Sequence, residues 1–318
     1  MVDQINARRA PFVPIYADTV DGASWKRFHD LICDSFREGA PVVFADNIDE
    51  FAANHLLDGD EYALNPSDVP NLVPPFEMFW LEWKTSVKQN SISGMSRVAA
   101  LILGQDHGDK LADLKGEPRF VFTVRYFYEL PWDSRGIGHP VQTSVFTSNG
   151  AGTLVNMFDC DDELLTGVKY TDDDPRNGNG SRRAHPFGMT VLVALSFMNC
   201  RNVGLRDGVI PPKLNAAHRR RNGRSLLQYK TIDIWPVSKL MHLTGDVTRE
   251  SARQALHIVR GHFKTYSGSG LFGKHKGTFF WGQYAAGNLS HGEIKSDYRI
   301  PLNGKAPFRA TDPERRRR

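Results

Sequence analysis

Four chemically active side chains alternate along the segment LHIVRGHFKTY, which runs from Leu256 to Tyr266. Successive side chains of a β-strand point to opposite faces of the strand. If this segment is a strand, one face presents Arg260, His262, Lys264 and Tyr266. Arginine and lysine bind phosphate, histidine exchanges a proton near neutral pH, and tyrosine hydrogen-bonds or stacks on a base. The face therefore suits DNA or RNA, and these four residues are the candidate catalytic residues.

Two interpretations of this face compete. In the first, the face binds or cleaves DNA or RNA; if it cleaves without metal, His262 is the general acid or base and Arg260 stabilises the charge of the transition state. In the second, the residues only keep the sheet hydrated, because an outward strand face is normally polar and often carries Arg, Lys and Tyr. Gly261 favours a site, because glycine weakens a strand and often marks a bulge or a close approach of another backbone.

Two further basic groups lie in the same third of the chain. The first, HRRRNGR at positions 218–224, is expected on a loop that leads into a strand over 226–235. The second lies in SGSGLFGKHK, which is expected to form a flexible hairpin loop before a strand over 277–284. Such clusters contact phosphates without reading sequence, although a solvated loop is the alternative. The candidate nucleic-acid-binding residues are Arg219, Arg220, Arg221, Arg224, Lys274, His275 and Lys276.

The charge of the chain is strongly asymmetric. Residues 201–318 contain 23 lysines and arginines against 8 acidic residues, whereas residues 1–200 contain 17 against 28. Such polarity reports on long-range fields and on partners rather than on fold, and it favours an anionic partner for the last third. The alternative is that the two parts face and neutralise one another.

The acidic and glycine-rich segments match no metal or nucleotide motif. An acidic group at 159–163 comprises Asp159, Asp161, Asp162 and Glu163. It lacks EF-hand spacing, so surface charge is the preferred interpretation over a divalent-metal site. The SNGAG and NGNG runs lack the GK[ST] or GxGxxG contexts of nucleotide-binding loops. We therefore predict no bound metal and no cofactor.

Glu82 stands among aromatic residues in the segment FWLEWKT. If its side chain points inward, desolvation would raise its pKa and make it a candidate acid or base. A partner such as Arg125 on a neighbouring strand would instead make Glu82 structural.

Strand patterns dominate the middle of the chain. The segments FEMFWLEWKT, SRVAALILG and RFVFTVRYFYEL are rich in β-formers, and each is bounded by loop-like residues. They predict three strands of one antiparallel sheet, to which residues 138–159 add further strands. MTVLVALSFM, at 189–198, is too short to cross a membrane and favours a buried helix over a strand. The predicted fold class is α+β, with an antiparallel sheet and flanking helices.

An N-terminal helical or irregular segment, residues 1–70, precedes this core. Apolar residues at helical spacing predict an amphipathic helix over Gly22 to Glu38, and a second, short helix is expected over Asn47 to Leu57. The α+β core covers residues 71–302, alone or as one domain with the N-terminal segment. Residues 303–318 form a basic tail whose terminal ERRRR is too charged to pack.

The remaining features indicate an intracellular protein. The N-terminus lacks the apolar core and cleavage pattern of a secretory signal. The three cysteines, Cys33, Cys160 and Cys200, are too few and too scattered for a disulfide framework or a zinc site. We expect a cytoplasmic protein without membrane contact, and the sequence indicates no oligomeric state.

Several passages together resemble a known group of proteins. FEMFWLEW, ALSFMNCRNV and HIVRGHFKTYSGSGLFGKHKGTFFW, followed by Asp297 and Tyr298, are similar to uncharacterised proteins encoded in bacteriophage and prophage genomes. The resemblance spans about two-thirds of the chain, from Phe76 to Tyr298. It implies a phage-derived protein expressed in the bacterial cytoplasm, and it implies no activity, cofactor or catalytic residue.

The sequence thus favours a phage-type protein that binds DNA or RNA through its basic C-terminal surface. Two alternatives stay open. One is a non-enzymatic phage protein that binds a host or phage protein or forms an assembly. The other is a nuclease with a His, Arg and Lys site.

Overall fold

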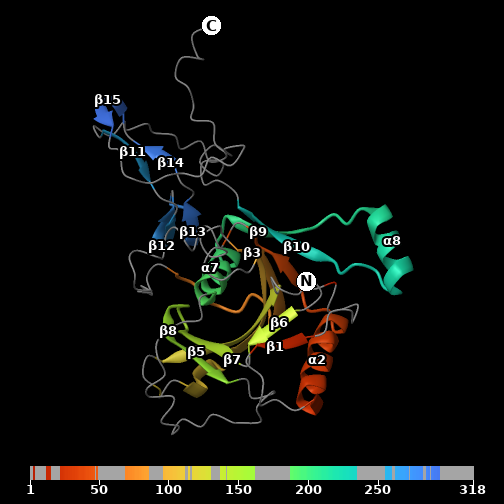
Figure 1. The fold of residues 1–318 in the computed structure, drawn as a ribbon. Coiled ribbons are helices and arrows are strands. Elements are labelled where there is room, and N and C mark those ends of the chain that lie inside the picture. The colour runs from red at the N-terminus through yellow and green to blue at the C-terminus, as the bar shows by residue number, and fades with distance from the viewer. Residues whose placement is uncertain are drawn as a thin grey trace.

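A large mixed β-sheet occupies the centre of the chain in the computed structural model (Figure 1). The structure describes residues 3, 12–15, 22–46, 48, 69–85, 96–111, 114, 117–129, 137–140, 142–161, 187–234, 255–259, 262–271, 273–281, 284–286 and 288–293. Within these residues the strands follow the order β1-β6-β5-β4-β3-β2-β10-β9, and β7 and β8 branch from β5.

Three long strands form the middle of this sheet. They are β3 (Met78–Lys84), β4 (Arg97–Asp106) and β5 (Pro118–Glu129), each antiparallel to the next. The three β-rich segments of the sequence therefore form neighbouring antiparallel strands, as predicted. Both faces are buried along most of β3 and β4 and along the second half of β5, whereas the first half of β5 alternates between buried and more exposed residues.

One side of the sheet divides at β5. The first branch is β6 (Ile137–Pro140), which pairs with the end of β5 and lies parallel to β1 (Phe12–Ile15). The second is β7 (Gln142–Asn149), which pairs antiparallel with the first half of β5 and with β8 (Leu154–Asp161). A short 3-10 helix, η2 (Gly108–Leu111), lies between β4 and β5.

The other side of the sheet contains parallel pairs. β2 (Val42–Phe44) is parallel to both β3 and β10 (Tyr229–Ile234), and β9 (Val203–Asp207) runs antiparallel to β10. The α+β class is confirmed, whereas the expectation of a purely antiparallel sheet is wrong. β2 and β10 join the sheet after long connections instead of tight hairpins, and such connections permit parallel pairing.

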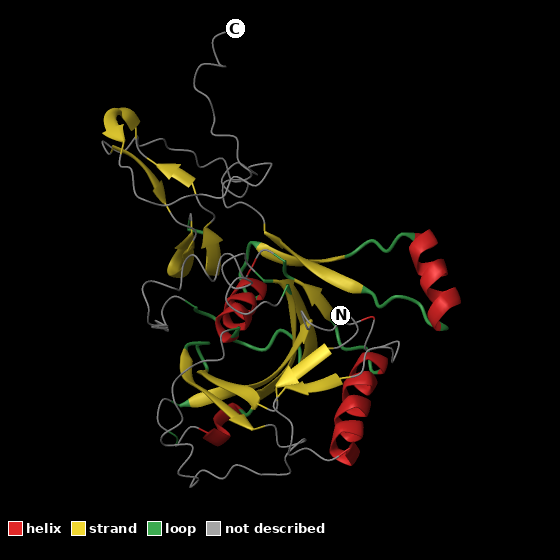
Figure 2. Cartoon of the chain, viewed as in Figure 1, coloured by secondary structure: helices red, strands yellow, loops and turns green. Residues whose placement is uncertain are grey.

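Two helices cover opposite faces of the sheet (Figure 2). Helix α7 (Gly188–Met198) packs with Phe79, Leu81 and Trp83 in the larger core. Helix α2 (Gly22–Arg37) packs with Trp80, from the other side of β3, in the smaller core. The predicted helix is confirmed. Because α7 is apolar on all sides, it is stable only where all of its sides are buried.

The N-terminal segment contributes to both layers. Helix α2 forms where the apolar spacing predicts it, and β1 and β2 join the sheet beside later strands. Apart from Ile48, the second helix expected over Asn47 to Leu57 lies outside the described residues. A helical character for the rest of residues 1–70 therefore stays a prediction, and the basic tail at 303–318 also lies outside the described residues.

The described strands from residue 255 onward form two smaller sheets. β12 (His262–Leu271) pairs with β13 (His275–Trp281). β11 (Ala255–Val259) lies between β14 (Tyr284–Ala286) and β15 (Asn288–Glu293). Of the helices in the described ranges, none combines the length and the apolar character that crossing a membrane requires.

Candidate functional site

The β12–β13 hairpin contains most of the chemically active residues of the sequence. The two strands are antiparallel, with His262 opposite Trp281 and Tyr266 opposite Gly277. The hairpin expected here forms, with GTFFW as the partner of HFKTY. The predicted single strand from Leu256 to Tyr266 is instead two strands, β11 and β12, that belong to different sheets. Arg260 and Gly261, between them, lie outside the described residues, so the place of Arg260 in the site stays a prediction.

The expectation of a flexible hairpin loop is wrong. β12 continues to Leu271, which pairs with His275, so the connection is a tight turn that contains Lys274. The Ser-Gly run forms an irregular part of β12: Gly268 and Gly270 take positive φ angles, and the register shifts between Tyr266 and Leu271. His275 and Lys276 consequently belong to β13 rather than to a loop.

The inner face of the hairpin is attached to the core. Phe263 and Phe280, which are opposite each other, both contact the Phe197 ring of α7, at centroid distances of 5.1 and 4.5 Å. On the same face, the hydroxyl groups of Thr265 and Thr278 lie 2.9 Å apart. The hairpin is therefore held against the end of α7 by an aromatic cluster.

The free edge of β13 is also bonded to the main body. The Asn202 carboxamide is fully buried; its Nδ2 donates to the Phe280 carbonyl at 2.7 Å, and its Oδ1 accepts from the Phe280 N–H at 2.8 Å. The N–H of Arg201 donates to the Thr278 carbonyl at 2.8 Å. These bonds replace those of a neighbouring strand and fix the hairpin beside residues 201–202.

The outer face of the hairpin combines cations with aromatic rings. The Lys264 ammonium lies 5.2 Å from the centre of the Tyr266 ring, and that ring meets Phe279 edge to face at 5.9 Å. Tyr266 and Trp281 pack against a small cluster of Leu271 and Phe279. His262 and Lys264 are exposed on this face. The structure therefore brings His262, Lys264 and Tyr266 onto one strand face, as the alternation predicts.

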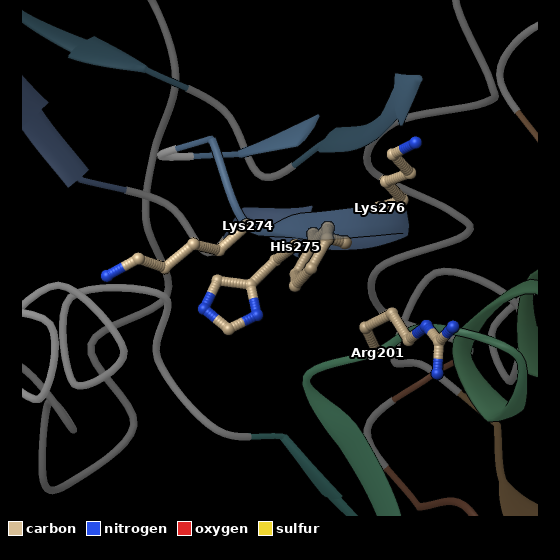
Figure 3. A pocket seen from close by; sticks show the side chains of 5 residues that line it. Arg201, Lys274, His275 and Lys276 are labelled. Carbon is tan, nitrogen blue, oxygen red and sulfur yellow. The ribbon is translucent and has the colours of Figure 1, made fainter. Parts of the chain in front are cut away.

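A hollow of about 300 Å³ opens at the turn end of this hairpin, lined by Arg201, Lys274, His275, Lys276 and Phe279. Figure 3 shows Lys274 and Lys276 extending in different directions, with His275 between them and Arg201 across the hollow. Arg201 lies over Gly277, since a Cβ there would come within 3.0 Å of Arg201 Cγ. A side chain at position 277 would thus displace the arginine.

The hollow lies in a segment with no opposing charge. The sequence contains no Asp or Glu between Glu250 and Glu293, so β12 and β13 contribute no carboxylate. Among the described residues, the buried Nε2 of His275 and Nε1 of Trp281 have no hydrogen-bond partner. The surface therefore offers cations and aromatic rings, with no carboxylate from the hairpin beside them.

The second basic cluster lies elsewhere, and the loop expected at 218–224 is wrong. Arg219, Arg220 and Arg221 occupy the last turn of helix α8 (Pro212–Asn222), and Arg224 follows it. Pro212 at the first turn and Gly223 in the left-handed region after the last residue are strong helix boundary signals. α8 projects to one side of the molecule, away from β12 and β13 (Figure 1). The two basic groups do not converge in one site.

Glu82 is part of the structural core. Its side chain is buried, accepts from Arg97 Nε at 2.6 Å, and accepts from Trp80 Nε1 at 3.3 Å. Arg97 also lies 3.6 Å from Asp46. An ion pair satisfied in this way favours the structural interpretation of Glu82 over acid–base chemistry.

The acidic group at 159–163 is only partly described. Asp159 accepts a hydrogen bond from the buried Ser144 hydroxyl, and Asp162 and Glu163 lie outside the described residues. Within the described ranges, no three or more His, Cys, Asp or Glu residues gather in a way that would hold a metal ion.

Sequence reasoning missed Arg201 and Phe279. Arg201 is distant in sequence and reaches the hollow only because residues 201–202 bond to β13. Phe279 resembles an ordinary core residue of a strand. One signal was available: the alternation that groups Lys264 with Tyr266 also groups His275, Phe279 and Trp281 on the partner strand.

Comparison of the chain with protein-family models, with curated proteins and with solved structures finds no match. The resemblance to phage-encoded proteins and the cytoplasmic location stay predictions from the sequence.

Proposed function

We propose that this chain binds nucleic acid, DNA or RNA, through the outer face of the β12–β13 hairpin. The observation that carries the proposal is the hollow lined by Arg201, Lys274, His275, Lys276 and Phe279, beside the partly exposed rings of Tyr266 and Trp281. Cations neutralise the phosphate backbone, and partly exposed aromatic rings beside them stack on unpaired bases. A phage-encoded protein in the bacterial cytoplasm would meet such polymers directly.

The geometry excludes one form of cleavage, in which His262 and His275 act as an acid–base pair. His262 and His275 lie near opposite ends of the hairpin, because His262 pairs with Trp281, six residues from His275 along β13. At about 3.3 Å per residue, the two imidazoles are roughly 20 Å apart along the strand. An acid–base pair must contact the same phosphodiester, so these histidines cannot act together on one bond.

Binding can be measured with fluorescein-labelled single-stranded DNA and RNA of random sequence, by anisotropy over a series of salt concentrations. The wild type should bind with an affinity that falls steeply with salt. The double variant Lys274→Gln/Lys276→Gln should bind about tenfold more weakly. Its salt slope should also be about 1.4 smaller, since each lost contact to a single strand contributes about 0.7.

The matched control is Lys26→Gln/Lys110→Gln, which removes the same charge from exposed positions on α2 and η2. This control should bind as the wild type does. Equal losses in both double variants, or no binding by the wild type at low salt, would contradict the proposal.

The same samples test the alternative that the protein is a nuclease. Labelled DNA and RNA should stay intact with and without magnesium if the hairpin only binds. Cutting that disappears in His262→Ala, while binding survives, would instead establish His262 as a catalytic residue.

A second candidate function is assembly, or binding of a protein partner. It is favoured by Val209, with 84% of its surface exposed, and Leu214, with 56%, on the projecting part of the chain around α8. It predicts an oligomer in light scattering that dissociates in Val209→Ser/Leu214→Ser. A monomer over a wide concentration range that co-purifies with no protein would exclude it.

A further inference from the structure

Helix α8 is the tip of an arm. β9 and β10 pair at the edge of the main sheet, and α8 with its two flanking loops connects their far ends (Figure 2). No residue of α8 is buried, and none belongs to a hydrophobic cluster of the described chain. The core therefore gives α8 no packing energy.

Local bonds hold the helix instead. The Gly223 N–H donates to the Arg219 carbonyl at 2.8 Å, with Gly223 at a φ of 71°. Asn215 Oδ1 accepts from the Leu226 N–H at 2.9 Å, and His218 Nδ1 donates to the Arg224 carbonyl at 2.9 Å. The helix is thus fastened to the chain that follows it by a few side chains on one face.

The opposite face is shaped by small and basic side chains. At about 100° per residue, Asn215, His218 and Asn222 share the fastened face. The outward ridge, on the other side, consists of Lys213, Ala216, Ala217 and Arg220. Arg219 and Arg221 project about 100° to either side of Arg220. Two alanines therefore occupy the middle of a ridge that ends in cations and is flanked by arginines.

Between its two strands, the arm carries only positive charges. The sequence contains no Asp or Glu between Asp207 and Asp233, while this stretch includes Lys213, Arg219, Arg220, Arg221 and Arg224. Cations spaced around a projecting helix suit a partner that presents anionic groups on both sides of it.

We propose that α8 enters the major groove of double-stranded DNA; this inference rests on the proposed nucleic-acid function. The B-form major groove is about 12 Å wide and admits one α-helix, whereas the major groove of A-form RNA is too narrow for side chains to read. Ala216 and Ala217 let the helix backbone approach the base edges. Arg219 and Arg221 then reach phosphates on the two strands, and Lys213 and Arg220 face the bases.

The test measures anisotropy with three probes of one sequence: a DNA duplex, an RNA duplex and the single DNA strand. Arg219→Gln/Arg221→Gln should bind the DNA duplex at least about tenfold more weakly, with a salt slope smaller by about 2, because each phosphate contact contributes about 0.9. Binding of the single strand, which the hairpin provides, should change less than about twofold. Lys26→Gln/Lys110→Gln is again the charge-matched control.

A second variant separates groove entry from general attraction. Ala216→Leu keeps the charge and the helix, since leucine is a good helix former at this exposed position. Its added bulk should weaken duplex DNA binding about fivefold and leave the salt slope unchanged, because no phosphate contact is lost. Duplex affinity unchanged in Ala216→Leu would overturn the inference.

Other outcomes distinguish this inference from the proposed function. If Arg219→Gln/Arg221→Gln weakens all three probes equally, α8 is not a groove element, yet the hairpin proposal survives. If RNA and DNA duplexes bind equally well, the inference also fails. If Lys274→Gln/Lys276→Gln has no effect while the α8 variants lose duplex DNA, the hairpin proposal fails and the inference stands.

Discussion

Helices α7 and α8 are each eleven residues long and lie close together in the sequence, yet they form for opposite reasons. All residues of α7 from Gly188 to Phe197 are buried, and none of them is charged. No residue of α8 is buried, and five of the residues from Pro212 to Arg224 are lysine or arginine. Burial in the core stabilises the first helix, whereas boundary residues and side-chain bonds stabilise the second.

This difference separates residues that stabilise the fold from residues that the fold leaves exposed. Substitutions in α7 change the core that supports the sheet and the hairpin. Substitutions in α8 change a surface that the fold does not use. Four predictions test this contrast between the core and the arm, from the largest expected effect to the smallest.

The largest effect is expected for Leu195→Ala, compared with Leu214→Ala. Leu195 is 0% exposed in α7, so its truncation leaves a cavity and should lower the free energy of unfolding by about 2–5 kcal/mol. Leu214 is 56% exposed in α8, so its truncation should change that free energy by less than about 0.5 kcal/mol. Urea unfolding followed by circular dichroism measures both, and similar losses would contradict the comparison.

The second comparison is between alanine substitutions of two asparagines, Asn202 and Asn215. Asn202→Ala removes a carboxamide that satisfies both backbone groups of Phe280 and should cost about 2–3 kcal/mol of unfolding free energy. Asn215→Ala removes one bond, to the Leu226 N–H, at a partly exposed site. Its effect should be confined to faster hydrogen exchange at Leu226. A cooperative loss of stability in Asn215→Ala would show that the arm is coupled to the core.

A smaller effect is expected at the helix ends. Gly223 after α8 and Gly39 after α2 both have positive φ angles, 71° and 86°, and a Cβ at either site would touch nothing within 4 Å. Alanine should therefore cost about 1 kcal/mol of backbone strain at each position. Gly39→Ala should lower global stability, because α2 packs in a core. Gly223→Ala should only increase exchange of α8 amides and weaken duplex DNA binding a few-fold.

The smallest effect concerns Cys200, which follows α7. Burial raises the pKa of its thiol to about 12, from an ordinary value near 9. The neutral thiol is favoured in the folded state, so this contribution to stability is present below pH 9 and is lost as the pH rises from 9 toward 12. At pH 8, iodoacetamide should leave Cys200 unmodified in the native protein, with labelling only in denaturant. Rapid native labelling, read by peptide mass spectrometry, would contradict this burial.

The sequence predicted elements well where hydrophobicity alone decides them. The patterns around Met78–Lys84, Arg97–Asp106 and Pro118–Glu129 identified three neighbouring strands, and the apolar run at 189–198 identified α7. The parallel pairs of β2 were not predictable, because β2 has only three residues and its neighbours come from distant parts of the chain.

At α8 and in β12, residues in the sequence are consistent with the observed structure, but charge and Ser-Gly composition led to the prediction of a loop. Pro212 and Gly223 mark the ends of α8, yet the charge of HRRRNGR favoured a loop. In β12, the Ser-Gly run favoured a loop as well, although Gly268 and Gly270 fit a distorted strand. For the candidate site, alternation correctly grouped His262, Lys264 and Tyr266. It could not supply Arg201, which reaches the hollow through tertiary contacts.

Asn202 also sets the distance between the two basic surfaces. Its side chain is bonded to the hairpin, and the next residue, Val203, begins β9, the first strand of the arm. The hairpin is therefore anchored at Asn202 and the arm begins at Val203, with no linker to lengthen or shorten the span between them. A polymer that touches both surfaces would be covered over a fixed length, so the footprint of the protein is set by its fold.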